Sequence, residues 1–377
     1  MAGGREASWF QRFLLPGFAF KAVVIGGGYA TGRELAEFFL PSGPRGGLAG
    51  MLLAMGLWSA ICAVTFALAH ATRAFDYRGF FRELLGPGWV VFEVAYALFV
   101  VLILSVFGAA AGAIGAAVLG APPFLGTALL AVLIALFATF GNASVERLFK
   151  YVSFLLYGVY ALFVALSLGR FGDRIAAGFA MPAPQEASAY GWALGGLTYA
   201  SYNVVGAVVI LPVLRHLTSR RDAVVAGLVA GPLAMLPALL FFVAMIGFYP
   251  GIANVTLPSD TMLRALGVPA FHLLFQLMIF AALLESGTGS VHAINERVAG
   301  VWRARRGTDL SPGARAGIAA VLLVGCMAVA DRVGLVMLIG SGYRFLAHLI
   351  LATYIVPLLT LGVARLVRRP TARMVSA

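Results

Sequence analysis

The stretch VVIGGGYATGRELAEFF, Val23 to Phe39, decides how this chain folds. It begins as an apolar helix, continues through three consecutive glycines and a fourth at Gly32, and ends with three charged residues still flanked by apolar ones. Each glycine in a helix interior costs about 1 kcal/mol relative to alanine. The stretch therefore predicts a break in a helix, followed at once by charges that need partners.

The composition indicates that this helix lies in a lipid bilayer. The chain has 377 residues, of which 61% are hydrophobic and 11% charged, and its mean hydropathy is +0.95. Because a soluble domain carries about 25% charged residues, this chain could not cover a soluble surface. Its apolar runs are too long for barrel strands, and helices satisfy their own backbone hydrogen bonds in lipid. We expect an all-α, multi-pass protein of the cell membrane.

Ten apolar segments punctuated by proline and glycine predict ten transmembrane helices in a single domain over residues 1–377. Five plus five helices would place the first and sixth in corresponding positions of two halves of opposite orientation. The halves share no obvious sequence period, so an inverted repeat, about 13–168 and 190–366, is a hypothesis from topology. The segments are about 13–40, 46–70, 88–119, 123–141, 148–168, 190–214, 223–249, 268–299, 314–330 and 333–366.

The basic residues predict the orientation. Most of the 27 Lys and Arg residues fall in loops on one side of this topology, which places both termini in the cytoplasm. Basic loops that set topology and touch anionic lipid account for the net charge of +12, so we expect no nucleic-acid partner. The exceptions are Arg45, Arg170, Arg174, Arg264 and Arg332 on the other side, and Lys21, Arg33 and Arg344 within spans.

The glycines of the first span lie near mid-membrane. Gly26–Gly28 follow about 13 helical residues, or ~20 Å of rise. Gly28 and Gly32 also fit a small-residue packing face. Packing does not require the charges that follow, however, so we expect an unwound point.

The sixth span carries a polar cluster at similar depth, around Ser201, Tyr202 and Asn203, with Gly206 following. The hydroxyls could instead bond back to their own helix. Two interrupted spans in corresponding positions are typical of the binding site of a secondary transporter. The half-helix N-termini attract an anion and the freed carbonyls attract a cation.

The eighth span adds a carboxylate. Glu285, Thr288, His292 and Glu296 recur at helical spacing, with Ser286 and Ser290 bordering the face they form. Glu285 lies ~22 Å from the outer end, where a charge costs several kcal/mol unless it is paired or hydrated. We interpret it as a site for a proton, a sodium ion or a substrate amine, and a structural pair with Arg344 is the alternative. The residues near the cytoplasmic end, His292, Asn295, Glu296 and Arg297, form either a gate or a solvated face.

The outer halves of spans one and ten carry opposite charges. Arg33, Glu34 and Glu37 face Arg344 across these two elements, as either an outer gate or a static aqueous vestibule. We expect Glu34 and Glu37 to guard the entrance rather than touch the substrate.

The string GGGYATGRE, Gly26 to Glu34, resembles the first-helix motif of amino acid–polyamine–organocation superfamily transporters, which share the LeuT-like fold. It is most similar to the YkvI-like amino-acid permeases, whose first helix reads roughly Gly-x-Gly-Phe/Tyr-Ala-x-Gly-x-Glu before paired aromatics, here Phe38 and Phe39. TYASYN in span six and ESGTGSVHAINER in span eight also look like that family, so the resemblance covers nearly the whole chain.

The resemblance implies a five-plus-five inverted repeat with broken helices one and six, a substrate site between them and an ion site between helices one and eight. Glu285 adds a carboxylate that many relatives lack, so Na⁺ and H⁺ both stay open as the coupling ion. The substrate residues implied are Gly26, Gly27, Gly28, Tyr29, Ala30, Ser201, Tyr202 and Asn203. The coupling residues implied are Ala22, Ile25, Thr288, Ser286 and Glu285.

We therefore predict an ion-coupled secondary transporter of a small amino acid or related zwitterion. The rival is a small-molecule sensor on a transporter fold without net flux. An enzyme is disfavoured, because the spacing shows no paired acids, metal ligands, Ser-His-Asp set or dinucleotide fingerprint. We expect no cofactor beyond Na⁺ or H⁺.

Overall fold

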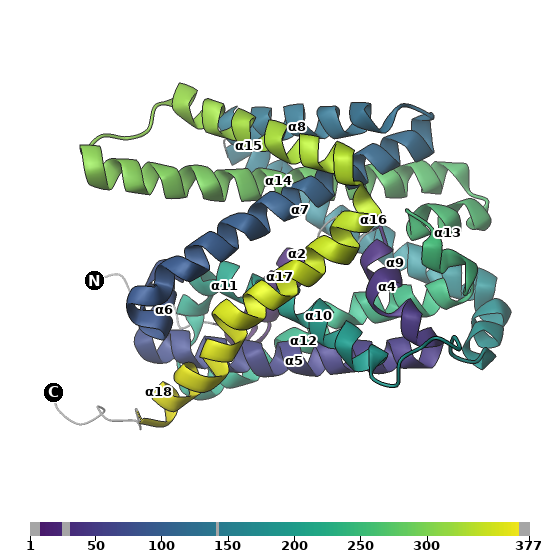
Figure 1. Cartoon of the computed structure of the whole chain (residues 1–377), viewed down its shortest axis with the longest axis horizontal. Helices are drawn as coiled ribbons and strands as arrows, with labels where there is room; N and C mark the ends of the chain where they lie inside the picture. Colours follow the sequence, from purple (N-terminus) through teal and green to yellow (C-terminus); the bar gives the residue numbers. More distant parts are fainter. Residues whose placement is uncertain (1–7, 25–30, 141–142, 369–377) are drawn as a thin grey trace.

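The computed structural model describes residues 8–24, 31–140 and 143–368, and in these ranges every regular element is a helix. Figure 1 shows the helices packed as one bundle, most of them running in the same general direction or opposite to it. Each of the ten predicted segments coincides, over its described residues, with one helix or with a series of shorter helices. Among the residues described, six helices are long and apolar enough to cross a membrane, so the count of ten spans stays a prediction.

The first half of the chain contains α1 to α9. Their bounds are α1 Trp9–Phe13, α2 Leu15–Val24, α4 Arg33–Phe38, η1 Leu40–Ser42, α5 Gly43–Thr72, α6 Tyr77–Leu85, η2 Gly86–Gly88, α7 Trp89–Leu119, α8 Pro123–Phe140 and α9 Ala143–Ala180.

The second half contains α10 to α18. Their bounds are α10 Gly191–Asn203, α11 Gly206–Val209, η3 Leu211–His216, α12 Arg220–Ile246, η4 Gly251–Asn254, α13 Pro258–Leu266, α14 Pro269–Arg306, α15 Pro312–Val333, α16 Leu335–Met337, η5 Leu338–Gly342, α17 Tyr343–Ile350, η6 Leu351–Ile355, η7 Leu358–Gly362 and α18 Val363–Arg368. The division into an inverted repeat stays a prediction.

Small residues hold the core helices together. α5 packs along α12 and α10, and the three lie side by side in the lower part of Figure 1. A Cβ added to Gly227 of α12 would lie 2.4 Å from the Cα of Ala63 in α5. Small residues at such contacts let backbones approach closely in lipid, where apolar burial gives helices little reason to associate.

Aromatic rings fill the space between α2, α5 and α10. Phe20 packs edge-on against Trp58 with ring centroids 5.6 Å apart, and Trp58 lies 5.5 Å from Tyr199. The indole of Trp58 donates to the carbonyl oxygen of Ala200 at 3.1 Å. A buried tryptophan needs a partner for its N–H, so this bond fixes the register of α5 against α10.

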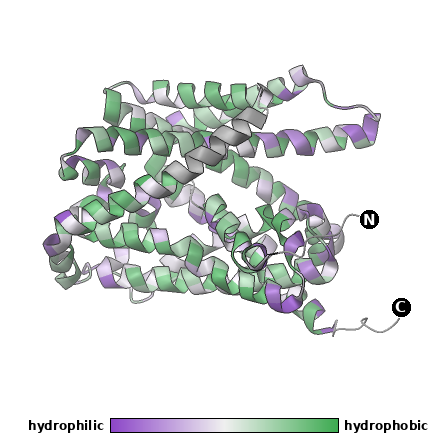
Figure 2. Cartoon of the chain, turned by 180° about the vertical axis from the view of Figure 1, so that it is seen from behind, coloured by the Kyte–Doolittle hydropathy of each residue, from purple (hydrophilic) through white to green (hydrophobic). Residues whose placement is uncertain are grey.

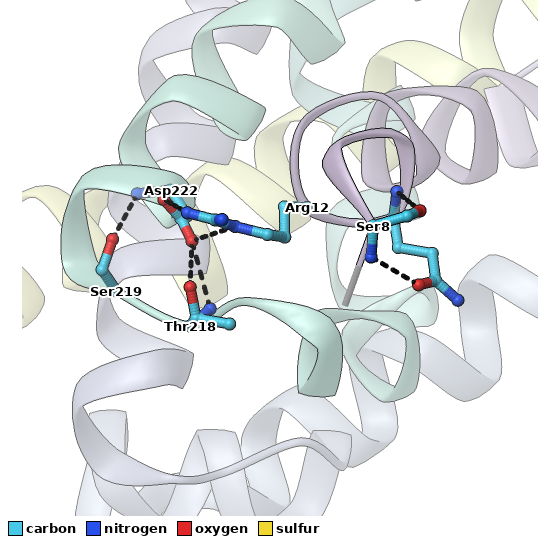
Figure 3. Close-up of polar contacts among 6 residues, drawn as sticks. Ser8, Arg12, Thr218, Ser219 and Asp222 are labelled. Carbon is cyan, nitrogen blue, oxygen red and sulfur yellow. Dashed lines mark hydrogen bonds and ion pairs between the residues drawn. The ribbon is translucent and has the colours of Figure 1, made fainter. Parts of the chain in front are cut away.

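Charged contacts gather at one end of the bundle. Arg12 of α1 donates through Nε and Nη2 to both carboxylate oxygens of Asp222, each at 2.9 Å, and Thr218 Oγ1 donates to the same carboxylate at 2.6 Å (Figure 3). Arg220 beside it donates to the carbonyl oxygen of Leu366 in α18 at 3.5 Å. These contacts bring α1, the start of α12 and α18 to one end.

Figure 2 shows hydrophilic residues gathered most densely at this end of the bundle. Figure 1 shows that α6 and the last turns of α14 also lie there. We call it the basic end, because it carries the arginines of the predicted cytoplasmic loops, and we call the other the opposite end. That the described chain starts and finishes at one end agrees with an even number of spans.

We predict that Gly227→Ala lowers the unfolding temperature of the detergent-purified protein, because the added methyl would press on the α5 backbone. Overpacking of this kind costs about 1–3 kcal/mol. Gly325→Ala is the matched control, since its Cβ would meet nothing within 4 Å. Equal unfolding temperatures for the two variants would contradict close α5–α12 packing.

Candidate functional site

The break predicted in the first span lies between α2, which ends at Val24, and α4, which begins at Arg33. Gly32 precedes α4 with a φ of +78°, a left-handed conformation that glycine adopts without strain. A side chain there would also collide with Phe241, whose ring lies 2.6 Å from the position of the missing Cβ. Ile25, Gly26, Gly27, Gly28, Tyr29 and Ala30, to which the sequence assigns ligand contacts, lie outside the described residues.

Arg33 is buried and held by groups at the opposite end of the bundle. Its side chain is 5% exposed. Nη1 donates to the carbonyl oxygens of Ala253 at 2.7 Å and Val255 at 3.0 Å, and Nη2 donates to Glu37 Oε2 at 2.8 Å. A buried charge is tolerated only when it is paired and hydrogen-bonded. These bonds therefore tie α4 to the segment around η4.

Glu37 joins two arginines. Its other carboxylate oxygen, Oε1, accepts a bond from Arg344 Nη2 at 2.8 Å. Arg344 lies in the first turn of α17 and is half exposed, whereas Arg33 is buried. The structure thus places the predicted opposite charges of spans one and ten in contact, with Glu37 between them. The alternative reading of Glu285 was a structural pair with Arg344. In the structure Arg344 pairs with Glu37.

A cavity of about 350 Å³ lies in the middle of the bundle. Its walls come from α2 and α4, from α7, from α10 and α11, and from α14, with one residue each from α9 and α17. Both segments predicted to be broken thus border it, as does the helix that carries Glu285. Among the predicted site residues the lining includes Ala22, Glu34, Tyr202, Asn203, Glu285 and Ser286.

Glu34 faces this cavity. It is 4% exposed, and Tyr202 donates its hydroxyl to Glu34 Oε2 at 2.6 Å. The ring of Tyr343 lies against that of Tyr202, with centroids 4.4 Å apart, and also lines the cavity. The sequence assigned Glu34 to the entrance together with Glu37. The structure separates the two carboxylates, because Glu37 contacts the arginines while Glu34 points inward.

Span six changes its winding where the sequence predicts an interruption. α10 ends at Asn203, and the amides of Ala207 and Val208 donate to carbonyls three residues earlier, in tight turns. Asn203 lines the cavity while its Nδ2 donates to the carbonyl oxygen of Tyr199 at 3.1 Å. Ser201 bonds back to the carbonyl of Leu197 at 2.7 Å, which is the alternative the sequence left open.

Span eight turns a slightly different face to the cavity than the spacing of its polar residues predicts. Glu285, Ser286, Gly289, Ser290 and Ala293 line it. Thr288 is instead buried beside this face, and its hydroxyl has no hydrogen-bond partner among the described residues. His292 and Glu296 are exposed, and Glu296 pairs with Arg315 at the start of α15. Ser286 and Ser290, which border the face predicted from the sequence, therefore lie within the face that lines the cavity.

Toward the basic end the wall includes Tyr96 of α7. The guanidinium of Arg297 lies over this ring at 3.6 Å from its centroid, and over Tyr77 at 4.0 Å. Arg297 is also 3.8 Å from Glu93 Oε1. These contacts join α6, α7 and α14 beside the cavity.

The exposure of the wall changes along the bundle axis. Glu34, Tyr202 and Tyr343, on the side of the opposite end, are each less than 5% exposed. Val23 and Val209, which lie further toward the basic end, are 38% and 41% exposed although they line the cavity. The wall is thus more exposed at Val23 of α2 and Val209 of α11 than at Glu34, Tyr202 and Tyr343.

Sequence reasoning missed the aromatic and aliphatic part of the site. Phe99, Ile103 and Phe107 of α7 line the cavity one or two turns apart, and Tyr343 completes it from α17. Their spacing on α7 is the only signal that sequence offered, and such spacing is equally typical of any buried helix face.

Comparison with known proteins identifies the fold. No protein-family model matches the chain. The chain is 24% identical over 283 residues to an uncharacterized membrane protein of Bacillus subtilis (strain 168), YkvI, covering 74% of this chain and 79% of that one.

Solved transporter structures resemble the chain over almost its whole length. MhsT in complex with L-phenylalanine has a TM-score of 0.57 at 16% identity, with 97% of this chain and 99% of that chain covered. A Na⁺-coupled sialic acid symporter in a substrate-bound outward-open state has a TM-score of 0.59 at 11% identity, covering 94% and 82%. A mutant of the manganese transporter of Eremococcus coleocola has a TM-score of 0.52 at 16% identity, covering 95% and 80%.

These likenesses show that the chain has the all-helical LeuT-like fold, and that the structures sharing it are transporters rather than enzymes. In the part of the chain that the structure describes, no three His, Cys, Asp or Glu side chains gather closely enough to hold a metal ion.

We predict that Arg33→Ala destabilises the protein by about 3–5 kcal/mol, because it leaves Glu37 short of a partner and two carbonyls without a donor. Arg344→Ala removes the other partner of the same carboxylate. We expect it to cost only about 0–1 kcal/mol, because an exposed pair is screened by solvent. Thermal unfolding of both purified variants checks the order, and a larger loss for Arg344→Ala would contradict it.

Proposed function

We propose that the protein is an ion-coupled secondary transporter of a small amino acid or a related zwitterion, working by alternating access. The observation that carries this proposal is a single one. Two carboxylates, Glu34 and Glu285, from different helices border one mid-bundle cavity beside both interrupted spans. Cavities at this position in broken-helix transporters bind substrate and coupling ion.

The chemistry of the cavity suits a small molecule that carries a positive group. Glu34 and Glu285 are acidic, while much of the remaining wall is apolar, with Phe99, Ile103 and Phe107 on α7. A zwitterion would direct its ammonium toward a carboxylate and its apolar body toward α7. In this proposal its carboxylate meets the backbone of residues 26–30, as the sequence predicts.

The coupling ion would bind between α2 and α14. Ala22 of α2 and Ser286 of α14 both line the cavity, as does Glu285, the neighbour of Ser286 in the chain. Thr288 lies beside this face of α14, and its buried hydroxyl, which has no hydrogen-bond partner among the described residues, could bind a cation only if α14 turned. Hydroxyl and carbonyl oxygens suit Na⁺, whereas Glu285 also suits H⁺.

The outer charges would act as the gate of the opposite end. Glu37 links Arg33, which is fixed to the segment around η4, to Arg344 of α17. Opening toward that end would separate α17 from α4, so the exposed Arg344–Glu37 contact is the one we propose to break. The Arg33–Glu37 contact lies within α4 and would move with it.

Transport and coupling can be tested together in proteoliposomes. We expect Glu285→Gln to abolish amino-acid uptake driven by a Na⁺ or H⁺ gradient while substrate counterflow without a gradient continues. Glu296→Gln, on the same helix but exposed and paired with Arg315, should leave both unchanged. Unchanged gradient-driven uptake in Glu285→Gln would contradict the role of this residue.

Ligand-induced thermal stabilisation with no counterflow in the unmodified protein would indicate a sensor instead.

The direction of opening gives a second test. In Val209→Cys we expect a membrane-impermeant thiol reagent to label the protein from the side of the basic end, and saturating substrate to slow the labelling. The native cysteines, Cys62 and Cys326, are buried and supply the background control. Labelling only from the side of the opposite end would contradict the proposed access path.

A further inference from the structure

A second cavity, of about 450 Å³, lies at the basic end between α6, the start of α7 and the last turns of α14. Four arginines line it, whereas the described residues of its wall include one carboxylate, Glu93. We propose that this cavity binds an anionic phosphate group, supplied by a phospholipid headgroup of the leaflet at the basic end. The arginines are Arg78, Arg297, Arg305 and Arg306.

The cavity carries an excess of positive charge. Glu93 accepts a hydrogen bond from the hydroxyl of Tyr77 at 3.0 Å and lies 4.0 Å from Arg78 Nη2 and 3.8 Å from Arg297 Nη1. One carboxylate can offset only one of four guanidinium charges. Guanidinium groups bind phosphate oxygens through paired N–H donors, so the excess of arginines favours a phosphate-type anion as the ligand.

The surroundings favour a lipid over a soluble anion. Val298, Val301 and Trp302 line the same cavity from α14, and they are 37%, 44% and 37% exposed. Trp302 carries the guanidinium of Arg306 over its ring at 4.7 Å. Tryptophan beside arginine is typical of the membrane interface, where the ring sits at headgroup depth.

The neighbouring helix offers a path for acyl chains. Exposed apolar residues recur along α7, beginning beside the cavity and running toward the middle of the bundle. They are Val90, Val91, Val94, Leu98 and Val101. In Figure 1 the end of α14 diverges from α6 and α7 at this point. A headgroup in the cavity would thus lie where its acyl chains can follow a lipid-facing surface.

This site goes beyond the proposed function, because the transport cavity is lined by neither Arg305 nor Arg306. The two cavities nevertheless share a neighbour. Arg297 lines the basic cavity and packs over Tyr96, which lines the transport cavity.

The test is lipid binding to the full-length protein in a zwitterionic detergent, measured by native mass spectrometry and by thermal shift. We expect dioctanoyl phosphatidylglycerol to bind and stabilise, and dioctanoyl phosphatidylcholine to do neither. Arg305→Gln with Arg306→Gln should weaken phosphatidylglycerol binding about thirtyfold, at roughly 1 kcal/mol per arginine. Arg221→Gln with Arg368→Gln, two exposed arginines of the same end outside the cavity, should change it less than about twofold.

Three results would overturn the proposal. Equal binding of the two lipids would exclude an anion site, and equal losses in the two double variants would indicate only the general charge of this end. Inorganic phosphate that binds as tightly as the lipid would assign the cavity to a soluble anion. Arg305→Lys with Arg306→Lys keeps the charge but loses the paired N–H donors, so its binding should lie between that of the unmodified protein and that of the glutamine variant, which separates charge loss from misfolding.

Discussion

The buried guanidinium of Arg33 is the constraint on which the site depends. A charge inside an apolar bundle must be satisfied by the protein, and three acceptors from two parts of the chain surround this one. They fix α4 against the segment around η4. Because neighbouring residues of a helix point about 100° apart, fixing Arg33 toward the opposite end leaves Glu34 directed into the cavity.

In this arrangement the three charged residues of α4 make different contacts. Arg33 fixes α4 to the segment around η4, Glu37 contacts the exposed Arg344, and Glu34 faces the mid-bundle cavity with Tyr202 as its hydrogen-bond donor. Tyr202 in turn belongs to the aromatic cluster that runs through Tyr199 and Trp58 to Phe20. The polar site is therefore backed by a stiff apolar wall, which holds its carboxylate in position.

The wall of the cavity differs from side to side. The Arg33–Glu37–Arg344 contacts lie toward the opposite end, beside Tyr202 and Tyr343, whereas α2 and α11 contribute the exposed Val23 and Val209. At the basic end, Arg297 connects this wall to a second, positively charged cavity. Under the proposed function, these two sides would open in turn.

The membrane setting, the all-helical class and the changes of winding near Gly32 and Asn203 could be predicted from the sequence, whereas the count of ten spans stays a prediction. These depend on composition and on local backbone preferences, which neighbours in the chain decide. Only the tertiary structure decided which face of each helix meets the cavity. It turned Ser286 rather than Thr288 inward, separated Glu34 from Glu37, and brought Phe99, Phe107 and Tyr343 to the wall. Helix rotation is set by packing between segments far apart in the chain, and periodicity cannot distinguish a face that lines a cavity from one that fills a core.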